Sequence, residues 1–104
     1  MSGTTLREFQ RRIEATYLER DRRRGLHGTF LWFAEEVGEL ARALKTLEPG
    51  NLKEEFGDVL AWLSTLASLS GVELEEAAAA YGDGCPACTA IPCKCPERPL
   101  ATMR

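Results

Sequence analysis

The chain of 104 residues, 44% of them hydrophobic, has the length of one domain with a modest core, and a core of this size favours self-association. It contains no run of about 20 apolar residues that could span a bilayer and no apolar N-terminal stretch of the signal-peptide type, so we expect a cytoplasmic protein without a membrane partner. The net charge of -3 argues against nucleic acid as a partner.

The first half of the chain predicts two amphipathic helices. Apolar residues recur at steps of three and four over about residues 5–24, which predicts a first helix that ends at Gly25. Thr29 is then expected to cap a second helix, whose apolar stripe keeps the same spacing. Pro49 and Gly50 are expected to stop that helix.

Two further helices are predicted after this turn. Asn51 is a suitable N-cap for the third helix, which is expected to end near Ser70 because Gly71 follows. A short fourth helix is expected over about residues 73–81. Because no segment alternates like a strand and the loops are short, we predict an all-α antiparallel bundle of four helices over residues 1–82, completed by oligomerisation.

Acidic residues gather on matching flanks of the second and third predicted helices. At about 100° per residue, Glu36 and Glu39 project together from one flank of the second helix. Glu55 and Asp58 occupy a corresponding flank of the third. Because neighbouring helices are antiparallel, the two pairs are expected to face each other. The alternative is that these acids belong only to solvated helix faces.

Converging carboxylates call for a cation. They would repel one another and raise their own pKa values unless a positive charge lies among them. Oxygen ligands favour a hard ion, so the four acids predict a site for Mg²⁺ or Mn²⁺. A di-iron bundle would need Glu-x-x-His pairs, and the single histidine, His27, lies outside both acidic pairs.

All four cysteines lie in a short tail, residues 83–104, that is rich in proline and has few apolar residues. Their pattern, Cys85-Pro-Ala-Cys88 and then Cys93-Lys-Cys95, is compact enough for four thiolates to meet one ion and predicts a tetrahedral Zn²⁺ site. Free thiols, disulfides and an iron–sulfur cluster are the alternatives. With little to bury, the tail would be ordered by its metal.

The acidic segment carries a resemblance to a known family. It contains Glu35-Glu36-Val-Gly-Glu39 and, one helix later, Glu55-Phe-Gly-Asp58. This resembles the EExxE and ExxD signature of the MazG-like nucleotide pyrophosphohydrolases, which belong to the all-α NTP pyrophosphatase superfamily. The resemblance covers roughly residues 28–82 and includes the glycines of both motifs.

The resemblance implies hydrolysis of a nucleoside triphosphate between its α and β phosphates, giving a monophosphate and pyrophosphate. Glu36, Glu39, Glu55 and Asp58 would be the magnesium ligands. Glu35, which projects about 100° away from Glu36, would be a second-metal ligand or the base that orients the attacking water. The resemblance also implies a homodimer or homotetramer with sites near the subunit interface.

Two tryptophans lie near the acids. Trp32 and Trp62 share the flanks of the acidic pairs, about one turn from each, so they could wall a nucleobase pocket by stacking; packing in the core is the alternative. The run from Arg20 to Arg24, interrupted by Asp21, is interpreted as a solvated helix end.

Two other functions remain open. One is a non-catalytic binding module whose zinc tail docks a protein or nucleic acid. The other is an inactive relative that binds nucleotide without cleaving it, because Ala80 stands where related members often have a lysine. The arrangement of acidic residues favours an enzymatic function, because a docking module does not require these carboxylates.

Overall fold

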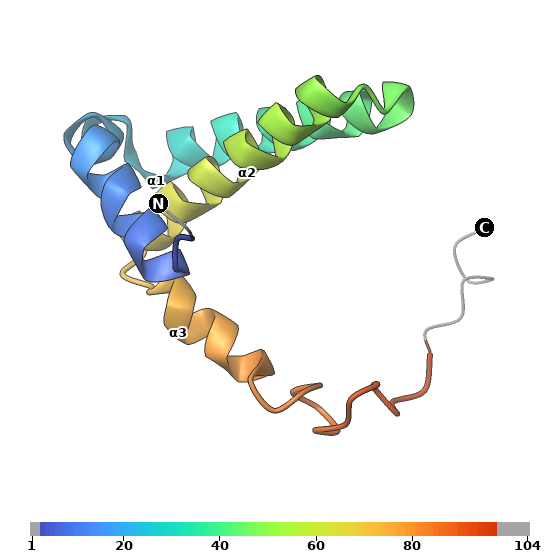
Figure 1. Cartoon of the computed structure of the whole chain (residues 1–104). Helices are drawn as coiled ribbons and strands as arrows, with labels where there is room; N and C mark the ends of the chain where they lie inside the picture. The colour runs from blue at the N-terminus through green and yellow to red at the C-terminus, as the bar shows by residue number, and fades with distance from the viewer. Residues whose placement is uncertain (1–2, 98–104) are drawn as a thin grey trace.

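The computed structural model describes residues 3–97 and consists of helices joined by short turns. In chain order it has α1 (Leu6–Thr46), α2 (Pro49–Leu69), α3 (Leu74–Ala78) and the 3-10 helix η1 (Ala79–Tyr81). Residues 3–97 contain no strand, so the all-α class is confirmed, with three α-helices where four were predicted. A long antiparallel hairpin is formed by α1 and α2, and α3 leads from it toward the C-terminal segment (Figure 1).

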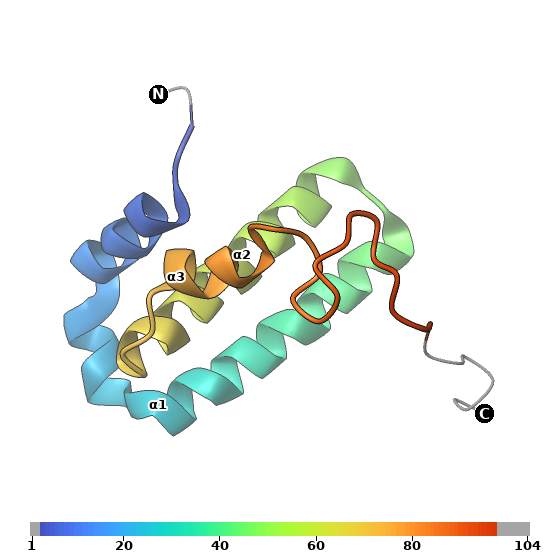
Figure 2. The ribbon, with the colours of Figure 1, turned by 90° about the horizontal axis from the view of Figure 1, so that it is seen from below.

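The two arms of α1 meet at Gly25. The helix assignment runs across this residue, although its backbone angles, φ 85° and ψ 170°, are not helical. Glycine adopts such angles because it has no Cβ. An N-terminal arm (residues 6–24) and a C-terminal arm (residues 26–46) therefore point in different directions, and Figure 2 shows the C-terminal arm running alongside α2. These arms correspond to the first two predicted helices, which Gly25 bends into one element.

Two predicted helix boundaries are wrong. Thr29 caps no helix, because it lies fully buried inside the C-terminal arm of α1. The turn between α1 and α2 comes early, since Leu47 adopts the left-handed conformation (φ 54°) and Pro49 already begins α2. Proline is tolerated in the first turn of a helix because the N–H that it lacks has no partner there. Glu48, rather than Asn51, is therefore the N-cap residue.

The end of α2 agrees with the prediction. Gly71 adopts a positive φ of 74° directly after the C-cap residue of this helix. Gln10 of the N-terminal arm fastens the corner that follows: its fully buried side chain donates to the carbonyl oxygen of Val72 at 2.9 Å and accepts from the backbone N–H of Leu74 at 2.9 Å. The fourth predicted helix is present as the short α3 followed by η1.

A single chain buries little apolar surface. Among the described residues, the buried hydrophobic ones are Ala43 and Ala67. Large apolar side chains lie exposed along the C-terminal arm and α2, with Phe30 and Phe56 each 54% exposed. We call these exposed residues the apolar face, which includes Phe30, Leu31, Val37, Leu44, Leu47, Phe56, Leu60 and Leu63. Within residues 3–97, no helix is long and apolar enough to cross a membrane.

Candidate active site

Three carboxylates meet between the two helices of the hairpin. Glu36 projects from the C-terminal arm of α1, while Glu55 and Asp58 project from α2. One carboxylate oxygen of each lies within 4.8 Å of the other two. Residues three apart share a helix face, so two packed helices are sufficient to bring them together. We call these three residues the carboxylate cluster.

The carboxylate cluster is electrostatically unfavourable by itself. Burial is the largest cause that raises the pKa of Glu36, followed by the negative charges of Asp58 and Glu55. Burial also leads the causes that raise the pKa of Glu55, and the charge of Asp58 comes next. The Oε1 atom of Glu55 is shielded from solvent and has no hydrogen-bond partner among the described residues. A shielded carboxylate oxygen without a donor destabilises the fold unless it gains a proton or a cation.

The residues present fit a hard divalent cation. All of their donor atoms are carboxylate oxygens, which suit Mg²⁺ or Mn²⁺ better than softer metals. The partnerless Oε1 of Glu55 is available as one ligand atom. Mg²⁺ is usually bound by few carboxylates, which leaves coordination positions for water and phosphate oxygens.

The two remaining acids of the predicted site lie at the edge of the carboxylate cluster. Glu39 does not belong to the converging three, and its Oε1 lies 3.9 Å from Nη1 of Arg42. Its charge nevertheless contributes to raising the pKa of both Glu36 and Glu55. Glu35 is exposed, and its charge also contributes to raising the pKa of Glu36. The roles of Glu35 and Glu39 stay predictions.

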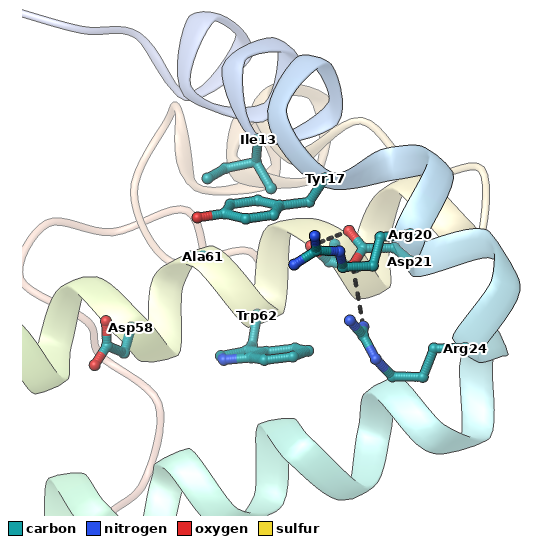
Figure 3. Close-up of a pocket in the computed structure, with 9 residues that line it drawn as sticks. Ile13, Tyr17, Arg20, Asp21, Arg24, Asp58, Ala61 and Trp62 are labelled. Carbon is teal, nitrogen blue, oxygen red and sulfur yellow. Dashed lines mark hydrogen bonds and ion pairs between the residues drawn. The ribbon is translucent and has the colours of Figure 1, made fainter.

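A cleft of about 260 Å³ opens beside the carboxylate cluster. Figure 3 shows Tyr17 of the N-terminal arm facing Trp62 of α2 across this cleft, with Asp58 on one side. Arg20 and Arg24 line it on the other side (Figure 3). Ligand pockets commonly measure about 300 to 1,000 Å³, so this cleft suits one planar group of a larger ligand. Its aromatic walls suit stacking.

Trp62 is held in place by neighbours on α1. The ring of Trp32 stacks on it with centroids 6.1 Å apart and an interplanar angle of 15°. The guanidinium carbon of Arg24 lies 4.8 Å from the centroid of the Trp62 ring. Arg24 is itself fixed by an ion pair of 3.0 Å to the buried Asp21, which also accepts a hydrogen bond of 3.2 Å from Thr65. Trp62 lines the cleft, whereas Trp32 is not among its lining residues.

Asp21 and Arg24 are residues of the site that the sequence did not predict, because their arginine-rich run is typical of a solvated helix end. In the structure Asp21 is only 3% exposed. A signal for this was present in the sequence, because Ile13, Tyr17, Asp21 and Arg24 are spaced by four, four and three residues. The charged pair thus continues the inward stripe of the N-terminal arm, and a carboxylate on such a stripe requires a buried partner.

The four cysteines form a second cluster within a segment that we call the cysteine loop (residues 85–95). Their four Sγ atoms all lie within 4.8 Å of one another. The Sγ atoms of Cys85 and Cys95 are 3.8 Å apart, those of Cys88 and Cys93 are 3.9 Å apart, and all four thiols are free. Hydrogen bonding from the backbone, led by the N–H of Lys94, lowers the pKa of Cys88 to about 6. Hydrogen bonding with the other thiols, led by Cys93, raises the pKa of Cys95 to about 11.

Comparison with protein families identifies the helical part of the chain. The family model described as the MazG nucleotide pyrophosphohydrolase domain matches residues 24–83. The matched segment contains the whole carboxylate cluster and Trp62, and it ends before the first cysteine. A search of curated proteins found no match to this chain.

Proposed function

The chain belongs to the MazG nucleotide pyrophosphohydrolase family, and on that premise we propose that it hydrolyses a nucleoside triphosphate to the monophosphate and pyrophosphate with Mg²⁺ as cofactor. The observation that carries this proposal is the convergence of Glu36, Glu55 and Asp58 inside the matched segment. An aromatic cleft directly beside these acids supports a nucleotide as the substrate.

The carboxylate cluster would hold the ion together with Glu39. This fourth acid lies one turn from Glu36 on the same helix flank, so a change of side-chain rotamer would bring it in. Its contact with Arg42 is long and exposed, and such ion pairs contribute little stability. When bound, Mg²⁺ would neutralise charge on the phosphate oxygens and help to supply the attacking water near neutral pH. Mn²⁺ would suit the same ligands.

Tyr17 and Trp62 would hold the nucleobase between their rings. Stacking of a base on an aromatic side chain contributes about 1–3 kcal/mol. A base in the cleft would direct its phosphates toward Asp58, because this residue lines the cleft and also belongs to the carboxylate cluster. Trp32 would act on the base indirectly, by holding Trp62 in place.

Glu35 would accept a proton from the attacking water. It is adjacent to Glu36 in the chain and exposed, and it lies outside the converging set of acids. A carboxylate that is not consumed as a ligand can act as a general base if it reaches the water.

A second copy of the chain would cover the apolar face. Exposed aromatic and aliphatic residues on two adjacent helices are typical of surfaces that pack against another subunit. We therefore propose a homodimer or homotetramer, with the substrate site near the interface. Light scattering would test this, and a monomer at micromolar concentration would contradict it.

Product analysis with a matched pair of variants tests the reaction. The full chain is incubated with Mg²⁺ and a panel of NTPs and dNTPs, and the products are separated by chromatography. We expect monophosphate and pyrophosphate, strong loss of turnover in Glu55→Gln, and retained turnover in Glu54→Gln, whose acid is exposed beside it. No turnover on any nucleotide, release of diphosphate and phosphate, or full activity of Glu55→Gln would refute the proposal.

A further inference from the structure

The cysteine loop lies outside the segment that the family model matches, and the proposed hydrolysis makes no use of it. We propose that its four thiols bind one Zn²⁺ ion as tetrahedral thiolate ligands, and that this ion is the main source of order in residues 84–97. The inference does not depend on the proposed hydrolysis, because it concerns other residues and other measurements.

The distances between the sulfur atoms carry the inference. A Zn–S bond of about 2.3 Å places any two sulfurs of a tetrahedral site about 3.8 Å apart. The structure has 3.8 Å between Cys85 and Cys95 and 3.9 Å between Cys88 and Cys93. All four sulfurs lie within 4.8 Å of one another, so a single ion can reach all of them. Disulfide bonds would need sulfur atoms about 2.05 Å apart.

Backbone N–H groups point at two of the sulfurs. Lys94 donates to Sγ of Cys88 at 3.3 Å, and Cys95 donates to Sγ of Cys93 at 3.3 Å. Such bonds favour the negatively charged thiolate, which is the form that binds metal. In the folded loop they also orient both sulfurs.

The backbone forms a tight turn around the first pair of cysteines. The N–H of Thr89 donates to the carbonyl oxygen of Cys85 at 2.7 Å, and the N–H of Cys85 donates to that of Ala90 at 3.2 Å. Gly84 lies so close to Ile91 that a Cβ at position 84 would be 2.7 Å from Cγ1 of Ile91, so the glycine permits this packing. This turn brings Cys85 and Cys88 to the same side of the loop as the second pair.

Little else can order this segment. Residues 82–97 contain turns and bends but no helix or strand, and Ile91, its largest aliphatic side chain, is 81% exposed. A segment that buries so little apolar surface does not recover the conformational entropy that it loses on folding. Binding of a structural zinc ion supplies that free energy in small domains of this kind.

The ligand set favours zinc in a structural role. Thiolates are soft ligands that prefer Zn²⁺ to Mg²⁺, so the two clusters of this chain select different ions. Four protein ligands fill a tetrahedral site and leave no position for a substrate or water. Iron also accepts four thiolates, and elemental analysis distinguishes it from zinc.

Metal content is the direct test. The full chain is reduced, stripped of metal, refolded with excess Zn²⁺ and dialysed, and bound metals are quantified by elemental mass spectrometry. We expect one zinc per chain and at least tenfold weaker zinc binding in Cys93→Ser, measured by competition with a chromophoric chelator. Lys94→Ala is the matched control, because Lys94 contacts Cys88 through its backbone N–H and not through its side chain.

Cobalt substitution provides a second measurement that does not depend on any variant folding. With Co²⁺ in place of Zn²⁺, the wild-type chain should show the intense visible bands of tetrahedral thiolate coordination. Absence of bound zinc after reconstitution, equal zinc affinity in Cys93→Ser, iron as the metal that the chain retains from cells, or two disulfides without metal would each overturn the inference. Activity is not used in any of these measurements, so failure of the proposed hydrolysis would leave them unaffected.

Discussion

The carboxylate cluster and the cysteine loop each bring several possible metal ligands together, but they do so with different kinds of local structure. In both, ligand atoms from several residues lie within 4.8 Å of one another. The carboxylates are carried by α1 and α2, whose contact fixes them in place, whereas the thiols are carried by a loop without regular structure. Helix packing therefore sets the positions of the carboxylates, whereas the thiols would depend on their proposed ion for a fixed arrangement.

Preorganisation has an electrostatic consequence for the carboxylate cluster. Because the helices hold the acids close together, burial and mutual repulsion raise the pKa values of Glu36 and Glu55. The cysteine loop has hydrogen-bond donors aimed at its sulfurs but little apolar burial. Its ion would therefore contribute to folding, whereas the ion of the carboxylate cluster would contribute to catalysis.

The largest expected effect is on turnover, and it distinguishes the proposed metal ligand Glu36 from the proposed general base Glu35. Glu36→Gln removes a proposed ligand, so we expect turnover to fall by at least about 100-fold and the Mg²⁺ concentration for half-maximal activity to rise. Glu35→Gln should lower kcat at an unchanged Mg²⁺ requirement, because it removes the proposed base only. The measurement is turnover as a function of Mg²⁺ concentration. Equal Mg²⁺ requirements in Glu36→Gln and the wild type would show that Glu36 is not a ligand.

The aromatic cleft should show a smaller effect, on binding rather than on chemistry. Trp62→Ala removes one wall, so we expect KM for the preferred nucleotide to rise roughly 10- to 100-fold, in line with about 1–3 kcal/mol of stacking. Trp62→Phe should restore most of the affinity, and Trp32→Ala should have the smaller effect because Trp32 does not line the cleft. Steady-state kinetics with a circular dichroism check of folding would measure this. An unchanged KM in Trp62→Ala would place the base elsewhere.

A third prediction concerns how the closely spaced acids lower the stability of the fold at neutral pH. The pKa of Glu55 is raised in the folded chain, so its protonated form stabilises the fold, and that contribution is lost as pH rises above the unfolded value of about 4.3. Without Mg²⁺, Glu55→Gln should therefore be more stable than the wild type near neutral pH, and its advantage should shrink as pH falls toward about 4.3. Thermal unfolding followed by circular dichroism measures the difference.

Two controls accompany this third prediction. Adding Mg²⁺ should stabilise the wild type more than Glu55→Gln, because only the intact cluster gains a full set of ligands. Glu76→Gln, at an exposed position of α3, should show no such dependence on pH or Mg²⁺. A wild type that stays more stable than Glu55→Gln at neutral pH without Mg²⁺ would contradict the electrostatic account.

Helical periodicity explains which parts of this site could be predicted from the sequence. A spacing of three or four residues sets the direction of a side chain, so the spacing alone predicts Glu36, Glu55 and Asp58 on facing flanks. Periodicity does not set the rotamer of a side chain, and Glu39 is not among the three acids that converge. It also cannot show that a charged residue is buried. Asp21 is buried because the N-terminal arm packs on α2, where Thr65 donates a hydrogen bond to it.

Helix ends were harder to predict, because the same residue can end, bend or begin a helix. Gly25 was expected to separate two helices, but one residue with positive φ reorients α1 without an intervening loop. Pro49 was expected to stop a helix and instead begins α2, a place where its missing N–H has no consequence. Such choices depend on tertiary packing, which local sequence does not encode.

The smallest expected effect tests the independence of the two clusters. Among the described residues, the hydrogen bonds of the cysteine loop join its own residues to one another and none joins it to α1 or α2. Cys93→Ser should therefore change the thermal midpoint of the helices by no more than about 2 °C, well below the shift of about 4–8 °C expected from 1 kcal/mol in a domain of this size. Amide exchange within residues 85–95 should increase at the same time, because the loop loses a ligand of the ion that orders it. Exchange measured by mass spectrometry would report both regions in one experiment, with Lys94→Ala as the control. Faster exchange in α2 of Cys93→Ser would show that the two clusters are coupled through the fold.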